Sequence, residues 1–328
     1  MASISEVPDD LAIITSYYNP QHYVSRRENF HCFARFLGQA ARNLFVVESA
    51  FESDDFELSE FPGLSRIRGG DVLWQKERIL NLAMRSLPEK FKKIAWVDCD
   101  LLFANPLWMK QASDALNEFP VIQLFDTIVR LPSEISKQFR RGTIQPNKLD
   151  SDHDEVWKGF AAIQRENPQK MLSGDFAAHG HTGFAWGIRR EIVQDLGFYD
   201  ACIAGSGDHM MAHAFCGDWD SICIDRIIEK SSPHRVHFEQ WCKRIYPRVR
   251  SRIGLVPGTI YHLWHGETLA RRYVLRNREL AALGFDPRRD IHVGPSGLWE
   301  WTGRNDRLRH WAIDYFKQRN EDGEAQSA

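Results

Sequence analysis

The chain has 328 residues, of which 43% are hydrophobic and 26% are charged, a composition typical of one large α/β domain or of two small domains. Its formal net charge of −2 and pI of about 6.7 exclude a global electrostatic attraction to nucleic acids or anionic membranes. No stretch approaches about 18 uninterrupted apolar residues, so we expect no transmembrane segment, and any membrane contact would be peripheral.

The first half of the chain alternates short apolar runs with segments of helical periodicity. Residues 11–14, 44–47 and 94–97 are typical of buried strands, whereas residues 23–42 and 74–87 carry apolar side chains at helical spacing. This alternation predicts a mainly parallel sheet with helices on its faces, where ligands bind beyond the carboxyl ends of the strands. We therefore expect the polar residues that follow these strands to share one edge of the sheet.

The second half of the chain is less regular. We interpret residues 126–175 as an insertion with one or two helices that lies over the site. Beyond it, residues 184–188 and 259–264 predict strands, and residues 189–196 and 208–215 predict helices. Residues 267–283 predict a long helix and residues 307–317 a last amphipathic one. The polar ends, residues 1–10 and 319–328, are expected to fray.

The cysteines and the N-terminus bear on the cellular compartment. The six cysteines are scattered and form no CxxC pair, which argues against a zinc ribbon or a redox motif. The N-terminus has no basic segment followed by an apolar run. We therefore expect a cytoplasmic protein with reduced thiols.

The strongest local feature is Asp98-Cys99-Asp100, directly after an apolar strand. Two carboxylates so close together can turn toward one cation when the strand ends there. Mg²⁺ and Mn²⁺ prefer oxygen ligands and leave positions open for phosphate. A metal held here would stabilise the charge on a departing diphosphate. A pair of solvated loop acids is the alternative, but the position at a strand end favours the metal site.

Two further segments carry candidate site residues. His262 and His265 could face one site across a turn, and neutral imidazole is a ligand for Mn²⁺ and for Zn²⁺. A hydrolytic zinc site and a pair of core or capping histidines are the alternatives. Asp208 follows Gly205-Ser206-Gly207, and it either caps a helix or acts as a general base.

Taken in order, these segments resemble the GT-A glycosyltransferases, in particular family 2 and the related galactosyl- and N-acetylgalactosaminyltransferases. The resemblance covers about residues 10–270. The matching segments are residues 13–19, 46–48, 76–81, 98–100, 183–191, 197–200, 205–208 and 262–266.

The resemblance implies an architecture and an activity. The fold would be a Rossmann-like GT-A core over residues 1–270, including the 126–175 insertion, followed by a helical extension over residues 271–328. The activity would be transfer of a sugar from a nucleoside-diphosphate sugar, most commonly a UDP-sugar, to an acceptor hydroxyl. The cofactor would be Mn²⁺ or Mg²⁺, and the acceptor a glycan, a lipid-linked molecule or a protein.

The resemblance also implies roles for the residues that would bind the donor. Thr15 and Glu48 would lie near the base and the ribose. Trp74, Lys76 and Asn81 would line the donor pocket, with Lys76 near the phosphates.

The metal site is implied in the same way. Asp100 would ligate the metal directly, and His265 would complete its shell. His262 would be a second histidine ligand. Asp98 would contact the ribose or a metal-bound water, as the other acid of the metal site.

Two residues would act on the sugar and the acceptor. Trp186 would pack against the transferred sugar or the acceptor, and Asp208 matches the catalytic base of inverting members. The familiar Gly-Gly-Glu-Asp segment is here Gly205-Ser206-Gly207-Asp208, with one acid instead of two, so an inverting reaction is favoured rather than fixed.

Alternatives of other classes stay open at this point. A metal-dependent nucleotide hydrolase or nucleotidyltransferase could use Asp98, Asp100 and His265, although no GxxxxGK[ST] loop is present. Residues 243–252 are basic with an interleaved tyrosine, as in a glycosyltransferase that acts on modified nucleic-acid bases, but the net charge argues against nucleic acid as a partner. Arg271, Arg272 and Arg276 either reach the diphosphate or form a solvated helix face.

Overall fold

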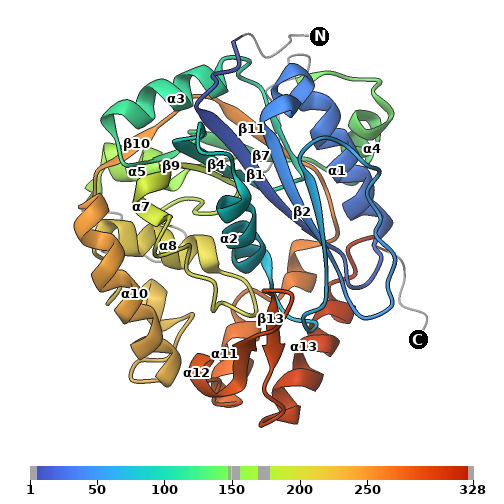
Figure 1. Cartoon of the computed structure of the whole chain (residues 1–328). Helices are drawn as coiled ribbons and strands as arrows, with labels where there is room; N and C mark the ends of the chain where they lie inside the picture. The colour runs from blue at the N-terminus through green and yellow to red at the C-terminus, as the bar shows by residue number, and fades with distance from the viewer. Residues whose placement is uncertain (1–5, 147–148, 150–155, 169–177, 324–328) are drawn as a thin grey trace.

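The computed structural model describes residues 6–146, 149, 156–168 and 178–323. Within these residues, seven strands form a central sheet in the order β10-β6-β9-β4-β1-β2-β3 (Figure 1). Strands β4, β1, β2 and β3 run parallel to one another, and β9 is antiparallel to both β4 and β6. The strands are β1 (Leu11–Tyr18), β2 (Leu44–Ala50), β3 (Leu64–Arg68), β4 (Lys93–Val97), β6 (Val121–Gln123), β9 (Ala185–Arg189) and β10 (Ile253–Leu255). The predicted α/β class with a mainly parallel sheet is confirmed.

Helices cover both faces of this sheet, and strand β1 shows why. All eight residues of β1 are buried, as expected for a central parallel strand, and successive side chains enter opposite cores. Ile14 packs in the core formed with α2, α8 and α10, whereas Ile13 packs in the core formed with α1 and α3. The helices are α1 (Val24–Leu37), α2 (Lys76–Ser86), α3 (Trp108–Glu118), α8 (Gly207–Cys216) and α10 (Pro233–Val249).

A second sheet, which the sequence did not predict, has the order β5-β11-β7-β8. Its strands are β5 (Leu101–Phe103), β7 (Thr127–Arg130), β8 (Val156–Lys158) and β11 (Thr259–His262). Strands β7 and β8, with α4 (Ser133–Arg141) and α5 (Phe160–Glu166), lie in the described part of residues 126–175. The expected insertion therefore contributes two strands to a sheet, and the rest of it lies outside the described residues.

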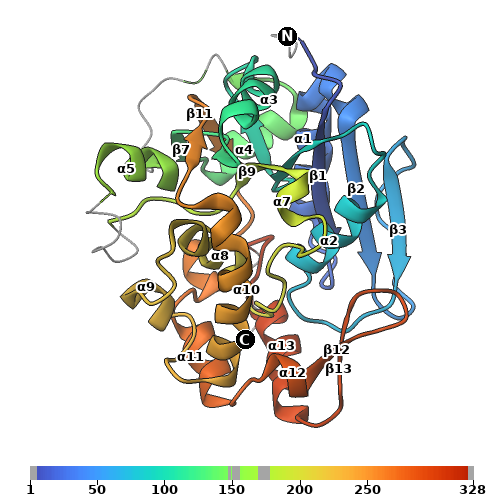
Figure 2. The same ribbon diagram turned by 60° about the vertical axis from the view of Figure 1, so that its left-hand side comes forward.

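The C-terminal region lies at the lower end of the molecule in both views, coloured orange to red (Figures 1 and 2). It contains α11 (Leu275–Ala282), α12 (Pro287–Asp290), α13 (Asp306–Gln318) and the hairpin of β12 (Ile291–Val293) and β13 (Trp299–Trp301). The prediction of one continuous helix over residues 267–283 is wrong. A short 3₁₀ turn, Thr268–Arg271, precedes α11, and Arg272 between them has a φ of 49°, which a continuous α-helix does not allow.

Two further features were expected from the sequence. No helix among the described residues is long and apolar enough to span a membrane. The six cysteines all lie in described parts of the chain, and no disulfide joins any two of them.

Candidate functional site

A cavity of about 560 Å³ opens at the carboxyl ends of β1 and β4. Because these two strands run parallel, Ser16 and Tyr18 of β1 and Asp98 after β4 reach the same edge of the sheet. The C-terminal region also lines the cavity, with Thr268 and Arg271 near its start and with Arg319 directly after α13. This is the edge where the sequence predicted a ligand.

The two sheets bring three predicted metal ligands together. Strand β5 starts directly after Asp100 and pairs antiparallel with β11, which places His262 opposite Leu101. The turn after β11 returns His265 to the same point, so that its Nε2 lies 3.1 Å from Asp100 Oδ2 and the Nε2 of His262 lies 3.6 Å away. The possible ligand atoms of these three residues all lie within 4.8 Å of one another.

The donor chemistry of this group fits a divalent cation. Asp100 Oδ1 is buried and makes no hydrogen bond with any residue that the structure describes. Burial raises the pKa of Asp100, but His262 and His265 outweigh this effect and hold the pKa well below its ordinary value. Burial also lowers the pKa of His262 to about 4, so its imidazole is neutral at neutral pH. A carboxylate and neutral imidazoles are suitable ligands for Mn²⁺.

Glu321 holds His265 in place and was missed in the sequence. Its Oε2 lies 3.3 Å from His265 Nδ1 in a charge contact, while Arg271 donates to His265 Nε2 at 2.9 Å, so a metal bound at Nε2 would take the place of that hydrogen bond. Glu321 is buried and pairs with Arg26 and Arg319. The expectation that residues 319–328 fray is therefore wrong at its first positions, because these ion pairs bind the segment to α1 and to the turn after β11.

The C-terminal segment passes so close to residue 266 that only a glycine fits there. Its φ is 84°, and a Cβ there would lie 2.7 Å from the carbonyl oxygen of Asn320. A side chain at this position would push the C-terminal segment, and with it Glu321, away from His265.

Lys76 links the other two acids of the cavity. Its Nζ lies 2.6 Å from Asp98 Oδ1 and 2.5 Å from Asp208 Oδ2. Trp96 donates its indole N–H to Asp208 Oδ1 at 3.2 Å. Asp98 thus pairs with Lys76 and lies outside the group formed by Asp100 and the two histidines. Asp208 lies in the first turn of α8, whose N-cap position is Ser206, so Asp208 is not the capping residue.

The remaining predicted residues lie at different depths. Trp74 lines the cavity, with Arg319 over its ring at 5.1 Å. Asn81 is buried and bonds the backbone of Phe198. Trp186 is buried in the core, stacked on Trp96 with 6.1 Å between ring centroids.

Thr15 and Glu48 also lie inside the protein. Thr15 is 1% exposed, and Glu48 accepts hydrogen bonds from the backbone N–H groups of Glu57 and Leu58. Neither residue is among the described residues that line the cavity, and the same is true of Asn81 and Trp186. Their proposed roles in donor binding remain predictions.

Basic residues dominate the wall of the cavity. Three carboxylates line it together with seven basic side chains among the described residues, so an anionic ligand is favoured. Arg271 and Arg276 are buried and line the cavity, so the interpretation of a solvated helix face is wrong for both. The seven basic residues are Arg26, Lys76, Arg130, Arg226, Arg271, Arg276 and Arg319.

The basic segment of residues 243–252 lies elsewhere, at the end of α10 and just beyond it. Arg248 pairs with Asp195 at 2.6 Å, and Arg252 donates to the carbonyl oxygen of Glu118. These contacts attach the end of α10 to neighbouring elements, so part of the predicted basic surface has a structural role.

Glu77 lies beside Lys76 and Asp208, and its titration tests this group of charges without an activity assay. Burial raises its pKa to about 8, Lys76 opposes the shift, and Asp208 adds to it. The folded protein therefore keeps a proton that the unfolded chain releases near pH 4.5, and stability should fall between pH 4.5 and about 8. We expect Glu77→Gln to gain stability over wild type as the pH rises, by at most about 1.4 kcal/mol per pH unit.

Urea unfolding near pH 5 and near pH 8 measures this difference. Glu118→Gln, at an exposed position of α3, is the control and should show no pH-dependent gain. An equal stability difference between Glu77→Gln and wild type at both pH values would contradict the assignment.

Comparison with known proteins gives similar structures only. No protein-family model matches the chain, and no curated protein matches it. The fold is similar to glucosyl-3-phosphoglycerate synthase from Mycobacterium tuberculosis, solved with Mg²⁺ and UDP, with a TM-score of 0.39, 12% identity and coverage of 89% of this chain and 87% of that chain. It is also similar to the catalytic domain of Drosophila β1,4-galactosyltransferase 7, with a TM-score of 0.31, 9% identity and coverage of 92% and 98%.

A third similar structure belongs to a different class of enzyme. This is 4-diphosphocytidyl-2C-methyl-D-erythritol synthase from Anaerococcus prevotii, with a TM-score of 0.29, 8% identity and coverage of 76% of this chain and 86% of that chain. Glycosyltransferases are thus among the structures that this chain is similar to, as the resemblance in sequence predicted. The function therefore follows from the chain's own site.

Proposed function

We propose that the protein transfers a sugar from a nucleoside-diphosphate sugar, with UDP as the first nucleotide to test, to an acceptor hydroxyl in a metal-dependent reaction. The observation that carries this proposal is the position of Asp100, His262 and His265 at the edge of a basic cavity that also contains Asp208. The cavity therefore contains positive charges that could bind a diphosphate and a carboxylate that could accept a proton from a hydroxyl group.

The metal would be held by Asp100, His262 and His265, with Mn²⁺ or Mg²⁺ as the candidates. When bound, it supplies positive charge to the departing diphosphate. Glu321 keeps His265 oriented for this role, and the buried Arg271 adds a second positive charge beside the same imidazole.

Arg276 and Arg319 would bind the phosphates from the other side of the cavity. Arg276 is already oriented by hydrogen bonds to Tyr315 and Ser206, and Arg319 by its ion pair with Glu321. Guanidinium groups fixed in this way bind phosphate oxygens with little further loss of conformational entropy.

Asp208 is the proposed general base, and an inverting displacement follows from that role. Its carboxylate would accept the proton of the acceptor hydroxyl as the hydroxyl oxygen attacks the anomeric carbon. Lys76 and Trp96 each contact one oxygen of this carboxylate and fix its orientation. Asp208 is the second residue of α8, so the helix holds its backbone in place.

Calorimetric titration of UDP, with and without Mn²⁺, tests the donor site. We expect a dissociation constant in the micromolar range with Mn²⁺ and binding at least about tenfold weaker without a divalent cation, since the metal neutralises the diphosphate. Failure of UDP and of every other nucleoside diphosphate to bind, with either Mn²⁺ or Mg²⁺, would contradict the proposal. Release of a free nucleotide or of diphosphate at the same rate with and without acceptors would instead indicate a hydrolase or a nucleotidyltransferase.

A further inference from the structure

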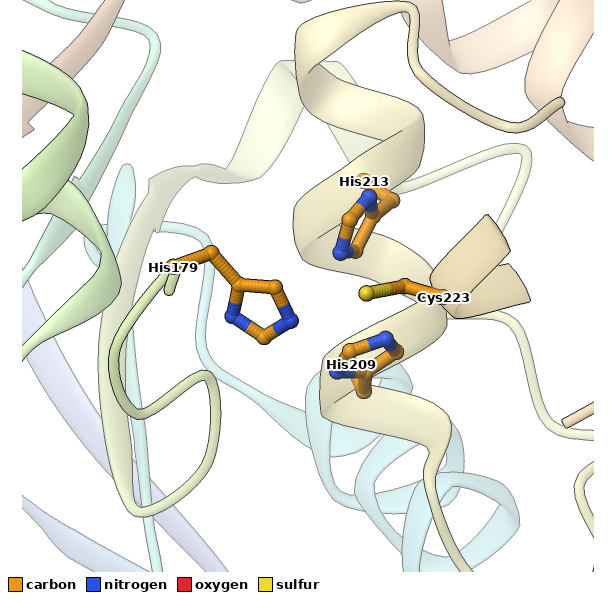
Figure 3. Close-up of side chains that lie close together, drawn as sticks. All are labelled: His179, His209, His213 and Cys223. Carbon is orange, nitrogen blue, oxygen red and sulfur yellow. The ribbon is translucent and has the colours of Figure 1, made fainter. Parts of the chain in front are cut away.

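A second group of possible metal ligands adjoins the cavity, and two of its members, His179 and His209, line the cavity wall. It consists of His179, His209, His213 and Cys223, all buried (Figure 3). Figure 3 shows the three imidazole rings and the Cys223 sulfur turned toward one another. The possible ligand atoms all lie within 4.8 Å of one another, and the ring centroids of the histidines are 4.6–5.1 Å apart.

Three separate segments bring these side chains together. His209 and His213 lie one turn apart on α8, so they project from the same face of the helix. Cys223 comes from α9 (Ile222–Asp225), and His179 from the segment that leads to β9. Two histidines at this helical spacing are a frequent half of a zinc site.

The outer contacts of the histidines are those of metal ligands. Each Nδ1 lies near an oxygen atom: His179 near the carbonyl of Gly180 at 2.9 Å, His213 near Asp218 Oδ2 at 2.8 Å, and His209 near a threonine hydroxyl at 3.4 Å. An Nδ1–H engaged in this way leaves the lone pair on Nε2.

His213 gives the sharpest evidence. It is completely buried, and its Nε2 makes no hydrogen bond with a residue in the described part of the chain. A buried nitrogen lone pair without a donor is costly unless something else binds it. A bond to a metal would satisfy it.

We propose that His179, His209, His213 and Cys223 bind one Zn²⁺ ion as a structural site. Three imidazoles and one thiolate suit tetrahedral zinc, and four protein ligands leave no position open for catalysis. Zinc bonds of about 2.0–2.3 Å need ligand atoms about 3.3–3.8 Å apart, so small side-chain rotations would close the shell.

Electric charge also balances at this buried site. Zn²⁺ and one thiolate leave a single positive charge, and the Asp218 carboxylate, bonded to His213, compensates for it. A buried site with no net charge avoids most of the cost of burying an ion.

The proposed zinc would hold the walls of the active-site cavity without taking part in the reaction. His209 follows Asp208 on α8, and the segment from His179 to Phe184 lines the cavity. Zinc would therefore fix the first turn of α8 and this segment relative to α9. The inference does not rest on the proposed transferase activity.

Metal analysis of the full-length protein tests the proposal. The chain is purified without chelators and its metal content is determined by mass spectrometry, and we expect one zinc ion per chain. Cys223→Ser and His213→Ala should lose it. Cys242→Ser, at an equally buried cysteine on α10, and Asp100→Ala should both retain it. Zinc that is lost in Asp100→Ala but kept in Cys223→Ser would place the metal at the other site and overturn the proposal.

A second measurement uses the wild-type protein, so it does not depend on whether a variant folds. Zinc is removed with a chelator and Co²⁺ is titrated in. We expect a thiolate-to-cobalt charge-transfer band that saturates at one equivalent, and a melting temperature at least about 5 °C lower in the stripped protein. Wild-type protein that contains no zinc and gives no such band would overturn the proposal.

Discussion

Asp100→Ala is expected to lower sugar transfer at least about 1,000-fold, since it removes the only carboxylate that the described structure places within reach of both His262 and His265. The two imidazoles alone would hold Mn²⁺ weakly, and the charge on the leaving diphosphate would be less well compensated. Binding of UDP should lose its dependence on Mn²⁺. Initial rates with a saturating donor and calorimetry of UDP with and without Mn²⁺ measure the two effects.

Asp114→Ala is the matched control for this variant. Asp114 is an exposed acid on α3 that pairs with Lys110, and it lies outside the cavity lining. It should keep wild-type transfer and Mn²⁺-dependent binding. If Asp100→Ala retained wild-type turnover, the assignment of Asp100 as a metal ligand would be wrong.

Asp208→Asn is expected to lower kcat by about 100- to 10,000-fold, the range for loss of a general base. The amide keeps the shape of the carboxylate but cannot accept the proton of an acceptor hydroxyl. Donor binding should change little, because the proposed metal group and the arginines around it stay intact. The prediction is thus a fall in kcat with an almost constant dissociation constant for UDP, measured on the same protein preparation.

Asp195→Asn serves as the control for an ion-paired acid outside the cavity. Asp195 pairs with Arg248, as Asp208 pairs with Lys76, and we expect this variant to keep its kcat. An Asp208→Asn variant with normal kcat, or one that loses UDP binding and kcat in equal measure, would exclude Asp208 as the base.

Local patterns in the sequence predicted several parts of the fold well. The apolar runs at residues 11–14, 44–47 and 94–97 became β1, β2 and β4, because buried parallel strands need apolar side chains on both faces. Helix α2 and helix α8 follow the predicted ranges within one or two residues. The helix predicted over residues 267–283 failed because its break depends on the backbone of Arg272, which apolar periodicity does not report.

The candidate metal site was predictable in part. Asp100, His262 and His265 were all chosen from the sequence, and the structure brings them together through the pairing of β5 with β11. Glu321 carried no local signal, because a polar segment near the chain end is typical of a frayed terminus. Its role depends on ion pairs with Arg26 and Arg319 that only packing creates.

The sequence by itself determined three central strands, the mainly parallel sheet, and the candidate ligands Asp100, His262 and His265. Periodicity and strand ends are local properties, and neighbouring residues specify them. Only the tertiary structure decided which distant groups meet: Glu321 with His265, Lys76 with both Asp98 and Asp208, and His179 and Cys223 with the two histidines of α8. These contacts depend on how loops and helices pack around the sheet. The spacing of residues along the chain does not fix the distance between such segments in space.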